Sequence, residues 1–193
     1  MNDTWDEFAA NWDANRDVIE YSEKAFHSLT EVANIEGWEV FDFGCGTGLL
    51  TEKISPLVKT VVSLDTSQKM IEVLAEKNLP NVNPICGTLS ELLNLDIALY
   101  QSRFNLVVAC SVCAFVPDYE DVLLQLISLL KRDGMFVQWD WFSSGESSGP
   151  GFTEKHIFDA IEKTGFRSVA VSIKFSMSAP DGDATVLMAV AQK

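Results

Sequence analysis

The chain has 193 residues, which is enough for a single domain with a sizeable buried core. Hydrophobic residues make up 47% of it and charged residues 22%, as in ordinary globular proteins, and no apolar run is long enough to span a membrane. The 28 acidic and 14 basic residues give a net charge of −14, which disfavours nucleic acid as a partner. The first residues lack the pattern of a signal peptide, so the sequence predicts a cytoplasmic protein.

Residues 3 to 33 are predicted to form one or two amphipathic helices. Trp5, Phe8 and Trp12 recur at helical spacing, and a second apolar stripe includes Tyr21 and Leu29. A stripe of this kind ordinarily packs against the core of its own domain. The pattern therefore predicts helices that are held against the rest of the chain.

Short apolar segments alternate with helical patterns from Trp38 onward. This alternation predicts right-handed crossovers and a mostly parallel sheet, whose ligands bind outside the carboxyl ends of the strands. The whole chain, residues 1–193, is expected to form one domain. The strands are predicted at residues 39–43, 60–64, 82–86, 104–109 and 135–140, followed by two closing strands at 168–175 and 184–191.

Capping and stop signals place the helices between these strands. The first is predicted to begin near Thr47 and to stop at Pro56, and Ser67 caps the second. Thr153 caps a late helix that ends at Gly165. Other helices are predicted from about Ser90 and over residues 119–130, the latter ended by Asp133 and Gly134.

Serine, glycine and proline dominate residues 143–151, a composition typical of a flexible loop. The segment follows the fifth predicted strand, at the edge where a ligand is expected. A substrate lid and a plain connector are equally compatible with this position, and the sequence leaves both open.

The most informative motif of the chain lies at residues 40–50. An apolar strand turns through Gly44, Gly46 and Gly48 and enters a helix, so the backbone can bend sharply with no Cβ facing a ligand. The amide end of that helix favours a carboxylate or phosphate. Asp65 ends the next strand, where its carboxylate can accept hydrogen bonds from both hydroxyls of a ribose. Together these features predict a site for a nucleoside cofactor.

The glycine spacing separates two classes of cofactor. A dinucleotide site requires Gly-x-Gly-x-x-Gly, whereas here the third glycine comes one residue early and Leu49 holds the required position. The run Asp42-Phe-Gly-Cys-Gly-Thr-Gly48 resembles instead the first motif of the class I S-adenosylmethionine-dependent methyltransferases. The resemblance covers nearly the whole chain, because residues 86–89 and 130–136 are also similar to segments of that family.

This resemblance implies a Rossmann-like α/β fold with S-adenosylmethionine as cofactor and S-adenosylhomocysteine as product. The implied sheet has seven mostly parallel strands in the order 3-2-1-4-5-7-6, with the last strand antiparallel and helices on both faces. Residues 1–36 would form an N-terminal helical lid over a core at residues 37–193. Trp12 and Tyr21 are the lid residues of first interest, although a packing role remains open for each.

In that family the glycine turn lies against the methionine part of the cofactor, and the acidic residue after the second strand binds the ribose. Thr88 stands where many relatives have an acidic residue that contacts adenine, and a hydroxyl accepts a hydrogen bond more weakly than a carboxylate. The cofactor-binding residues that the resemblance implies are Trp12, Asp42, Gly44, Cys45, Gly46, Gly48, Asp65, Thr66, Met70, Gly87, Thr88, Leu89, Cys110 and Ser111.

Methyl transfer from a sulfonium requires alignment of the reacting atoms and exclusion of water, with little acid–base chemistry. His27, Asp140 and His156 are the candidates for a general base, provided that they reach the pocket. Neither histidine lies in a recognisable catalytic motif, so a surface or structural role is the alternative for both. The methyl acceptor is expected to be a small molecule, and no motif identifies it.

The four cysteines are predicted to lie near the carboxyl ends of strands. Only Cys110 and Cys113 have CxxC spacing, and one such pair does not make a zinc site. Cys45, Cys86 and this pair are therefore interpreted as small apolar residues packed near a ligand, and no metal is predicted.

Two other classes of function share parts of this pattern. An NAD-dependent oxidoreductase would have the same strand, turn and acidic ribose ligand, but a different glycine spacing. A non-catalytic partner protein that binds S-adenosylmethionine would keep the glycines and Asp65 without turning over a substrate. The sequence favours a methyltransferase, as a monomer or a homodimer.

Overall fold

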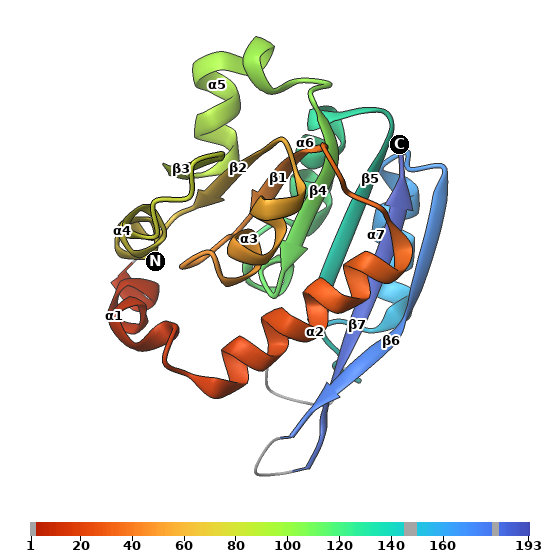
Figure 1. The fold of residues 1–193 in the computed structure, drawn as a ribbon. Coiled ribbons are helices and arrows are strands. Elements are labelled where there is room, and N and C mark those ends of the chain that lie inside the picture. Colours follow the sequence, from red (N-terminus) through yellow and green to blue (C-terminus); the bar gives the residue numbers. More distant parts are fainter. Residues whose placement is uncertain (1–2, 145–149, 179–181) are drawn as a thin grey trace. The chain divides into compact units, whose positions relative to one another are not determined.

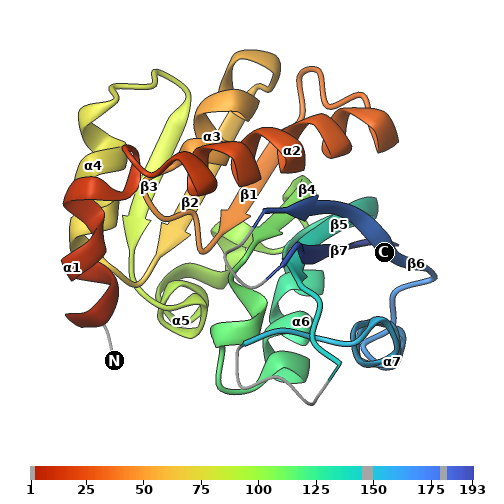
Figure 2. The same cartoon turned by 90° about the horizontal axis from the view of Figure 1, so that it is seen from below.

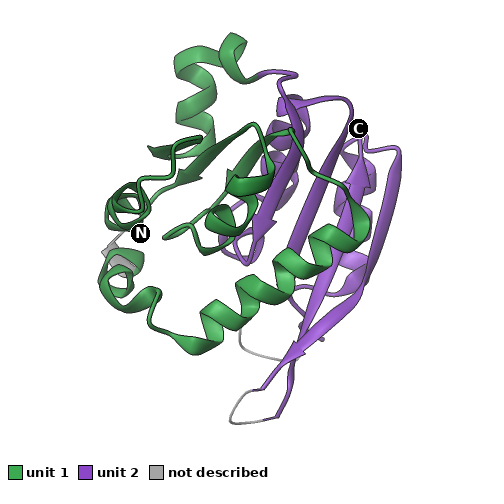
Figure 3. Ribbon diagram, viewed as in Figure 1, with its two compact units in different colours: residues 1–100 green, residues 101–193 purple. Residues whose placement is uncertain are grey.

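The computed structural model describes residues 3–144, 150–178 and 182–193 of the chain. Its strands form one seven-stranded sheet of order β3-β2-β1-β4-β5-β7-β6, which confirms the predicted α/β fold and strand order. Contacts divide the chain into two compact units, Met1–Tyr100 and Gln101–Lys193, drawn in green and purple in Figure 3. The expectation of a single domain stays a prediction.

The first unit contains three parallel strands and the N-terminal helices (Figure 1). In Figure 2, α2 and α3 lie on one side of these strands and α5 on the other. The strands are β1 (Glu39–Phe43), β2 (Thr60–Asp65) and β3 (Val82–Cys86), and the helices are α1 (Asp3–Trp12), α2 (Arg16–Val32), α3 (Leu49–Ile54), the 3₁₀ turn η1 (Ser55–Leu57), α4 (Gln68–Glu76) and α5 (Leu89–Tyr100).

Local signals in the sequence explain the helix ends of this unit. Ser67 caps α4, as predicted, because its side chain accepts a hydrogen bond from the backbone N–H of Met70. Pro56 lies in η1, which follows the last turn of α3, so the predicted stop is confirmed. The central strands β1 and β2 are almost fully buried, which fits the apolar residues that make up half or more of each strand.

The second unit contains the remaining strands, and β7 lies between β5 and β6. β4 and β5 pair in parallel, whereas β7 is antiparallel to both of its neighbours, which confirms the predicted direction of the last strand. The elements are β4 (Phe104–Cys110), the 3₁₀ turn η2 (Cys113–Phe115), α6 (Tyr119–Leu129), β5 (Leu130–Trp141), α7 (Glu154–Lys163), β6 (Ser168–Met177) and β7 (Ala184–Gln192).

One predicted boundary in this unit is wrong. The α6 helix ends at Leu129, and β5 begins at Leu130, so Asp133 and Gly134 lie inside the strand and do not end the helix. The register of β5 against β4 is irregular here, because Phe104 pairs with Leu130 and Leu106 already pairs with Met135. The intervening residues are held by the end of the chain, since Lys193 N donates to Gly134 O at 2.9 Å. This long-range pairing offsets the turn preference of Asp-Gly.

The base of the segment 143–151 is closed by two backbone hydrogen bonds. Ser143 N donates to Phe152 O at 2.8 Å, and Phe152 N donates to Trp141 O at 2.9 Å. Residues 145–149, which carry the prediction of a lid or a connector, lie outside the described residues. In the part of the chain that the structure describes, no helix is both long and apolar enough to cross a bilayer.

Candidate cofactor site

The turn after β1 has the backbone that its glycines predict. Gly44, Gly46 and Gly48 have φ angles of 68°, 55° and 81°, in the left-handed region that glycine adopts without strain. The turn is tied to the neighbouring strand, because the amides of Gly44 and Cys45 donate to Leu64 O at 2.8 and 3.1 Å. Gly48 is the N-cap of α3, so the helix starts directly from the turn. The result is a tight loop without side chains on its three glycines.

Asp65 connects this turn to the two loops that follow β2 and β3. Its Oδ2 accepts a hydrogen bond from Gly46 N and its Oδ1 one from Ser67 N, both at 2.8 Å. Its backbone carbonyl accepts from Gly87 N at 2.9 Å. Since each carboxylate oxygen can accept more than one hydrogen bond, both oxygens retain capacity for a ligand hydroxyl. Hydrogen bonds to Asp65 therefore bring together three of the predicted site residues, Gly46, Asp65 and Gly87.

Burial sets the protonation chemistry of Asp65. Loss of hydration raises its pKa above the usual value, and the backbone N–H donors of Ser67, Gly46 and Thr66 oppose this rise in part. The same donors favour the ionised form locally. The carboxylate thus has a rigid geometry and a perturbed pKa, two properties that are frequent at binding sites.

Trp12 lies near the turn, and its predicted role in cofactor binding stays a prediction. A Cβ placed on Gly46 would be 3.9 Å from the indole Nε1 of Trp12. The indole ring also makes an edge contact with Trp5, with ring centroids 5.9 Å apart. A side chain larger than hydrogen at position 46 would therefore begin to fill the space between α1 and the turn.

In the loop after β3, the Thr88 side chain is engaged in local hydrogen bonds. Thr88 N and Thr88 Oγ1 both donate to Glu91 Oε2 at 2.8 Å, and Glu91 N donates to Thr88 Oγ1 at 3.2 Å. This reciprocal pair is a capping box at the start of α5. The Thr-x-x-Glu signal is present in the sequence, but its capping role was missed. The side chains of Leu89 and Met70 are buried, while Thr66 is half-buried, and their predicted role in cofactor binding stays a prediction.

The side chain of Asp42 is hydrogen-bonded to the helix that follows the glycine turn. Its Oδ2 accepts from Thr51 Oγ1 in α3 at 2.5 Å, whereas its Oδ1 has no hydrogen-bond partner among the described residues. The side chain is 1% exposed. Burial raises its pKa to about 7, and the negative charge of Asp65 adds to this rise.

This raised pKa makes the stability of the chain depend on pH. Because the folded state holds the proton of Asp42 more tightly than the unfolded state, the free energy of unfolding decreases as pH rises from about 4 to about 7 and then levels off. The loss is on the order of a few kcal/mol. We expect a smaller decrease in Asp42→Asn, which keeps the hydrogen bond from Thr51 through its amide oxygen and keeps the share of Asp140, whose pKa is also raised to about 7. Urea unfolding of both proteins across this range tests it, and a constant difference between them would contradict the assignment.

The second unit holds the remaining predicted residues. Cys110 ends β4, and Ser111, with a φ of 54°, donates its backbone N–H to Trp139 O at 2.7 Å. His156 is exposed and lies with Phe152, with ring centroids 5.2 Å apart. It lines a pocket of about 360 Å³ whose other lining residues are Cys113, Ala114, Val116, Pro117, Asp118, Tyr119, Glu120 and Phe152.

Asp140 is enclosed in a buried hydrogen-bond network beside this pocket. Gln138 Nε2 donates to Asp140 Oδ2 at 2.8 Å, and Ala114 N donates to Asp140 Oδ1 at 3.4 Å. The network continues to Tyr119, whose hydroxyl donates to Gln138 Oε1 at 2.5 Å. Burial raises the pKa of Asp140 to about 7. With no exposed surface, this carboxyl supports the chain between β4 and α6 and has no path to a substrate in this conformation.

The other candidates are placed apart from these groups. His27 is exposed on α2, with its Nε2 3.3 Å from Glu31 of the same helix. None of the four cysteines forms a disulfide in the described residues, and Cys86 is exposed whereas Cys113 is buried. In the described ranges, no three His, Cys, Asp or Glu side chains are grouped to hold a metal ion.

A glycine turn after the first strand and a carboxylate after the second, on a sheet of this order, define a nucleoside-cofactor domain of the methyltransferase type. Residues 41–136 match the family model of the methyltransferase domain. This match spans just under half of the chain, and together with the fold it supports a class I S-adenosylmethionine-dependent methyltransferase, a family whose cofactor is S-adenosylmethionine.

Individual relatives agree with this assignment. The chain is 31% identical over 129 residues to an uncharacterized methyltransferase of Schizosaccharomyces pombe, covering 62% of this chain and 45% of that protein. It is 33% identical over 104 residues to the ubiquinone biosynthesis O-methyltransferase of Bradyrhizobium diazoefficiens, covering 52% and 39%. The structure of a SAM-dependent methyltransferase from Aquifex aeolicus shares the fold with a TM-score of 0.72 at 16% identity, over 100% of this chain and 98% of that one. The chain spans less than half the length of these two curated relatives.

Proposed function

We propose that this chain transfers a methyl group from S-adenosylmethionine to a small-molecule acceptor. The observation that carries the proposal is the Asp65 carboxylate, fixed by Gly46 N and Ser67 N at 2.8 Å beside a turn of three left-handed glycines. A carboxylate in this position can accept hydrogen bonds from both hydroxyls of a ribose. The same turn leaves the backbone open to close approach by the rest of the cofactor.

The described residues fit an adenosyl cofactor in two further respects. Gly46 lacks a Cβ, so its backbone stays bare near the indole Nε1 of Trp12, which a Cβ would approach to 3.9 Å. Asp42 Oδ1 is a buried acceptor without a partner among the described residues, and a donor supplied by a ligand or by water would satisfy it. The first feature supports close approach of a ligand to the turn, and the second supports a hydrogen-bond donor beside Asp42.

In the proposed reaction the protein binds and orients its reactants. S-adenosylmethionine, when bound, supplies a methyl group activated by a sulfonium. Asp65 holds the ribose hydroxyls, the glycine turn gives room to the methionine part, and Trp12 excludes water from above the turn. Alignment and exclusion of water are the main protein contributions to a transfer of this kind.

For the acceptor we propose a hydroxylated small molecule, because one group of curated relatives is named for O-methyl transfer. A net charge of −14 disfavours nucleic acid as an alternative. His156, which lines the pocket of the second unit, is the residue we propose as the base that accepts the hydroxyl proton. The cytoplasmic location and the monomeric or homodimeric state stay predictions of the sequence.

Release of S-adenosylhomocysteine in the presence of a panel of phenols, alcohols and amines tests the proposed function. We expect turnover with at least one hydroxylated acceptor. Binding of both adenosyl ligands without turnover of any acceptor would favour the non-catalytic partner, and binding of NAD alone would favour an oxidoreductase. Both outcomes would overturn the proposal.

The role proposed for His156 has its own test once an acceptor is known. In His156→Gln the imidazole is replaced by an amide that can hydrogen bond but cannot take up a proton. We expect kcat to fall by about 100-fold. His27→Gln is the matched control on the exposed surface of α2. An unchanged kcat in His156→Gln would exclude the histidine as the base.

A further inference from the structure

Two carboxylates near the N-terminus contact the loops that form the cofactor site. Asp6 lies in α1, and its Oδ1 accepts hydrogen bonds from Ser67 Oγ at 2.5 Å and from Lys69 N at 3.3 Å. Asp13 follows α1 directly, and its Oδ1 accepts a hydrogen bond from Thr47 Oγ1. Residues seven positions apart lie two helical turns apart on the same side. One side of the α1 segment is thus attached to the loop after β1 and to the loop after β2.

The contact with Thr47 reaches the glycine turn itself. Thr47 lies between Gly46 and Gly48, and only 1% of its surface is exposed. Its hydroxyl is therefore screened from water and depends on Asp13 for an acceptor. Any displacement of the Asp13 carboxylate would leave a buried hydroxyl unsatisfied in the middle of the turn.

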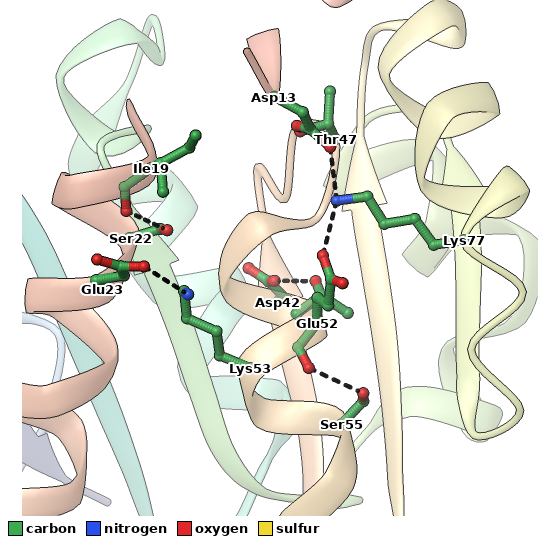
Figure 4. A network of polar contacts seen from close by, with 11 residues as sticks. Asp13, Ile19, Ser22, Glu23, Asp42, Thr47, Glu52, Lys53, Ser55 and Lys77 are labelled. Carbon is green, nitrogen blue, oxygen red and sulfur yellow. Dashed lines mark hydrogen bonds and ion pairs between the residues drawn. The ribbon is translucent and has the colours of Figure 1, made fainter. Parts of the chain in front are cut away.

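Lys77 holds the Asp13 carboxylate in place. Its Nζ lies 2.8 Å from Asp13 Oδ2 and 3.1 Å from Glu52 Oε2, and its side chain is 15% exposed (Figure 4). Lys77 is the C-cap of α4, and Glu52 lies in the first turn of α3, so each charge also suits its helix end. The ammonium group therefore links α3, α4 and the residue that follows α1.

We propose that Asp13 and Lys77 are positioning residues for the cofactor-binding turn. Lys77 orients Asp13, Asp13 fixes the Thr47 hydroxyl, and the backbone from Gly46 to Gly48 is thereby kept in the shape that receives the cofactor. Attachment of α1 and affinity for the cofactor are consequently coupled through one ion-paired cluster. The inference rests on the proposed function only for the identity of the ligand.

Removal of the ammonium charge should disturb the cluster more than removal of an isolated surface charge. Asp13 and Glu52 approach the same nitrogen, so without it two carboxylates face one another with no cation between them. The repulsion displaces Asp13, because Thr47 alone opposes it with a single hydrogen bond. The turn then loses its side-chain anchor while the strands beneath it remain intact.

The substitution Lys77→Met tests this chain of contacts, because methionine has a similar length and no charge. We expect the Kd for S-adenosylhomocysteine, measured by isothermal titration, to rise about tenfold, within the range of coupling in one ion-pair network. Lys77→Arg keeps the charge and should restore most of the affinity. The matched control is Lys53→Met, which breaks the pair between Lys53 and Glu23 of α2, 3.5 Å apart, without touching Thr47. Its Kd should equal that of the original chain.

Hydrogen exchange of the ligand-free protein gives a readout that does not depend on the cofactor. The amide of Gly46 donates to Asp65 Oδ2, and that of Gly48 donates to Cys45 O, so both are protected while the turn is intact. We expect both amides to exchange faster in Lys77→Met and unchanged in Lys53→Met. The effects of Asp13→Ala and Lys77→Met should also be non-additive in the double variant, because both act through Thr47.

The outcomes separate the two proposals. If the original chain binds the adenosyl ligands and Lys77→Met binds them equally well with unchanged exchange, the positioning role is overturned and the proposed function stands. If the original chain binds no adenosyl ligand, the proposed function fails and the exchange rates alone decide the positioning role. In that case, faster exchange of the Gly46 and Gly48 amides in Lys77→Met but not in Lys53→Met would still support the positioning role.

Discussion

Replacement of Gly48 by alanine should abolish cofactor binding and lower the free energy of unfolding by about 2–4 kcal/mol. Gly48 has a φ of +81°, and a Cβ at this position would lie 2.3 Å from Leu74 Cδ1. Leu74 is 2% exposed in α4, so its side chain cannot turn into solvent to make room. Backbone strain and overpacking against α4 therefore both contribute to the loss of stability in Gly48→Ala. Urea unfolding and titration with S-adenosylhomocysteine measure the two effects.

Gly37 supplies the matched control for this substitution. Its φ is +72°, but a Cβ there would have no heavy atom within 4 Å. Gly37→Ala should therefore show only the backbone cost, about 1–2 kcal/mol, with cofactor binding intact. Combining Gly48→Ala with Leu74→Ala should destabilise less than the sum of the two changes, because the smaller side chain frees the space. If Gly37→Ala and Gly48→Ala lower the free energy of unfolding equally, the Leu74 side chain moves aside without a measurable loss of stability.

Asp65→Asn should weaken binding of S-adenosylhomocysteine by at least about 100-fold, because hydrogen bonds to a charged acceptor contribute about 1.5–3 kcal/mol each. The amide keeps one acceptor but turns an NH₂ group toward Gly46 N or Ser67 N, both of which are donors. The site therefore loses its charge and part of its geometry together. The control is Asp17→Asn, which removes an equal charge from an exposed position on α2.

The affinity should also depend on pH through the same residue. Since burial raises the pKa of Asp65, the carboxylate takes up a proton at a higher pH than a free aspartate does. Binding should weaken as pH falls through this raised pKa, and recover as pH rises again. Titrations at several pH values measure it. Equal affinity of Asp65→Asn and the original chain at neutral pH would mean that the ribose is held elsewhere.

Local motifs made the central part of the site predictable from the sequence. The positive φ angles of the three glycines and the place of Asp65 at the end of β2 follow from residue types within a short segment. Strand order followed from resemblance to a family. The predicted start of β5 was wrong because Asp133-Gly134 has a strong turn preference. Backbone hydrogen bonds to Lys193, at the far end of the chain, hold these two residues within the strand.

The contacts that surround the site could not be predicted from local sequence patterns. Asp13 and Lys77 are far apart in sequence, and each read alone is an ordinary surface charge. Their meeting depends on how α1 and α4 pack, which no spacing rule encodes. Thr88 is the opposite case, because its capping partner Glu91 lies three residues away and the signal was available.

The place of β7 between β5 and β6 bears on how the chain is made. Both neighbours leave the ribosome before β7 does, and each then presents a row of unpaired backbone groups. The gap is closed only when β7 inserts and pairs antiparallel on both sides. The second unit consequently cannot complete its sheet during synthesis until residues 184–192 have emerged, and a nascent chain stalled before that point carries two strand edges open to other chains.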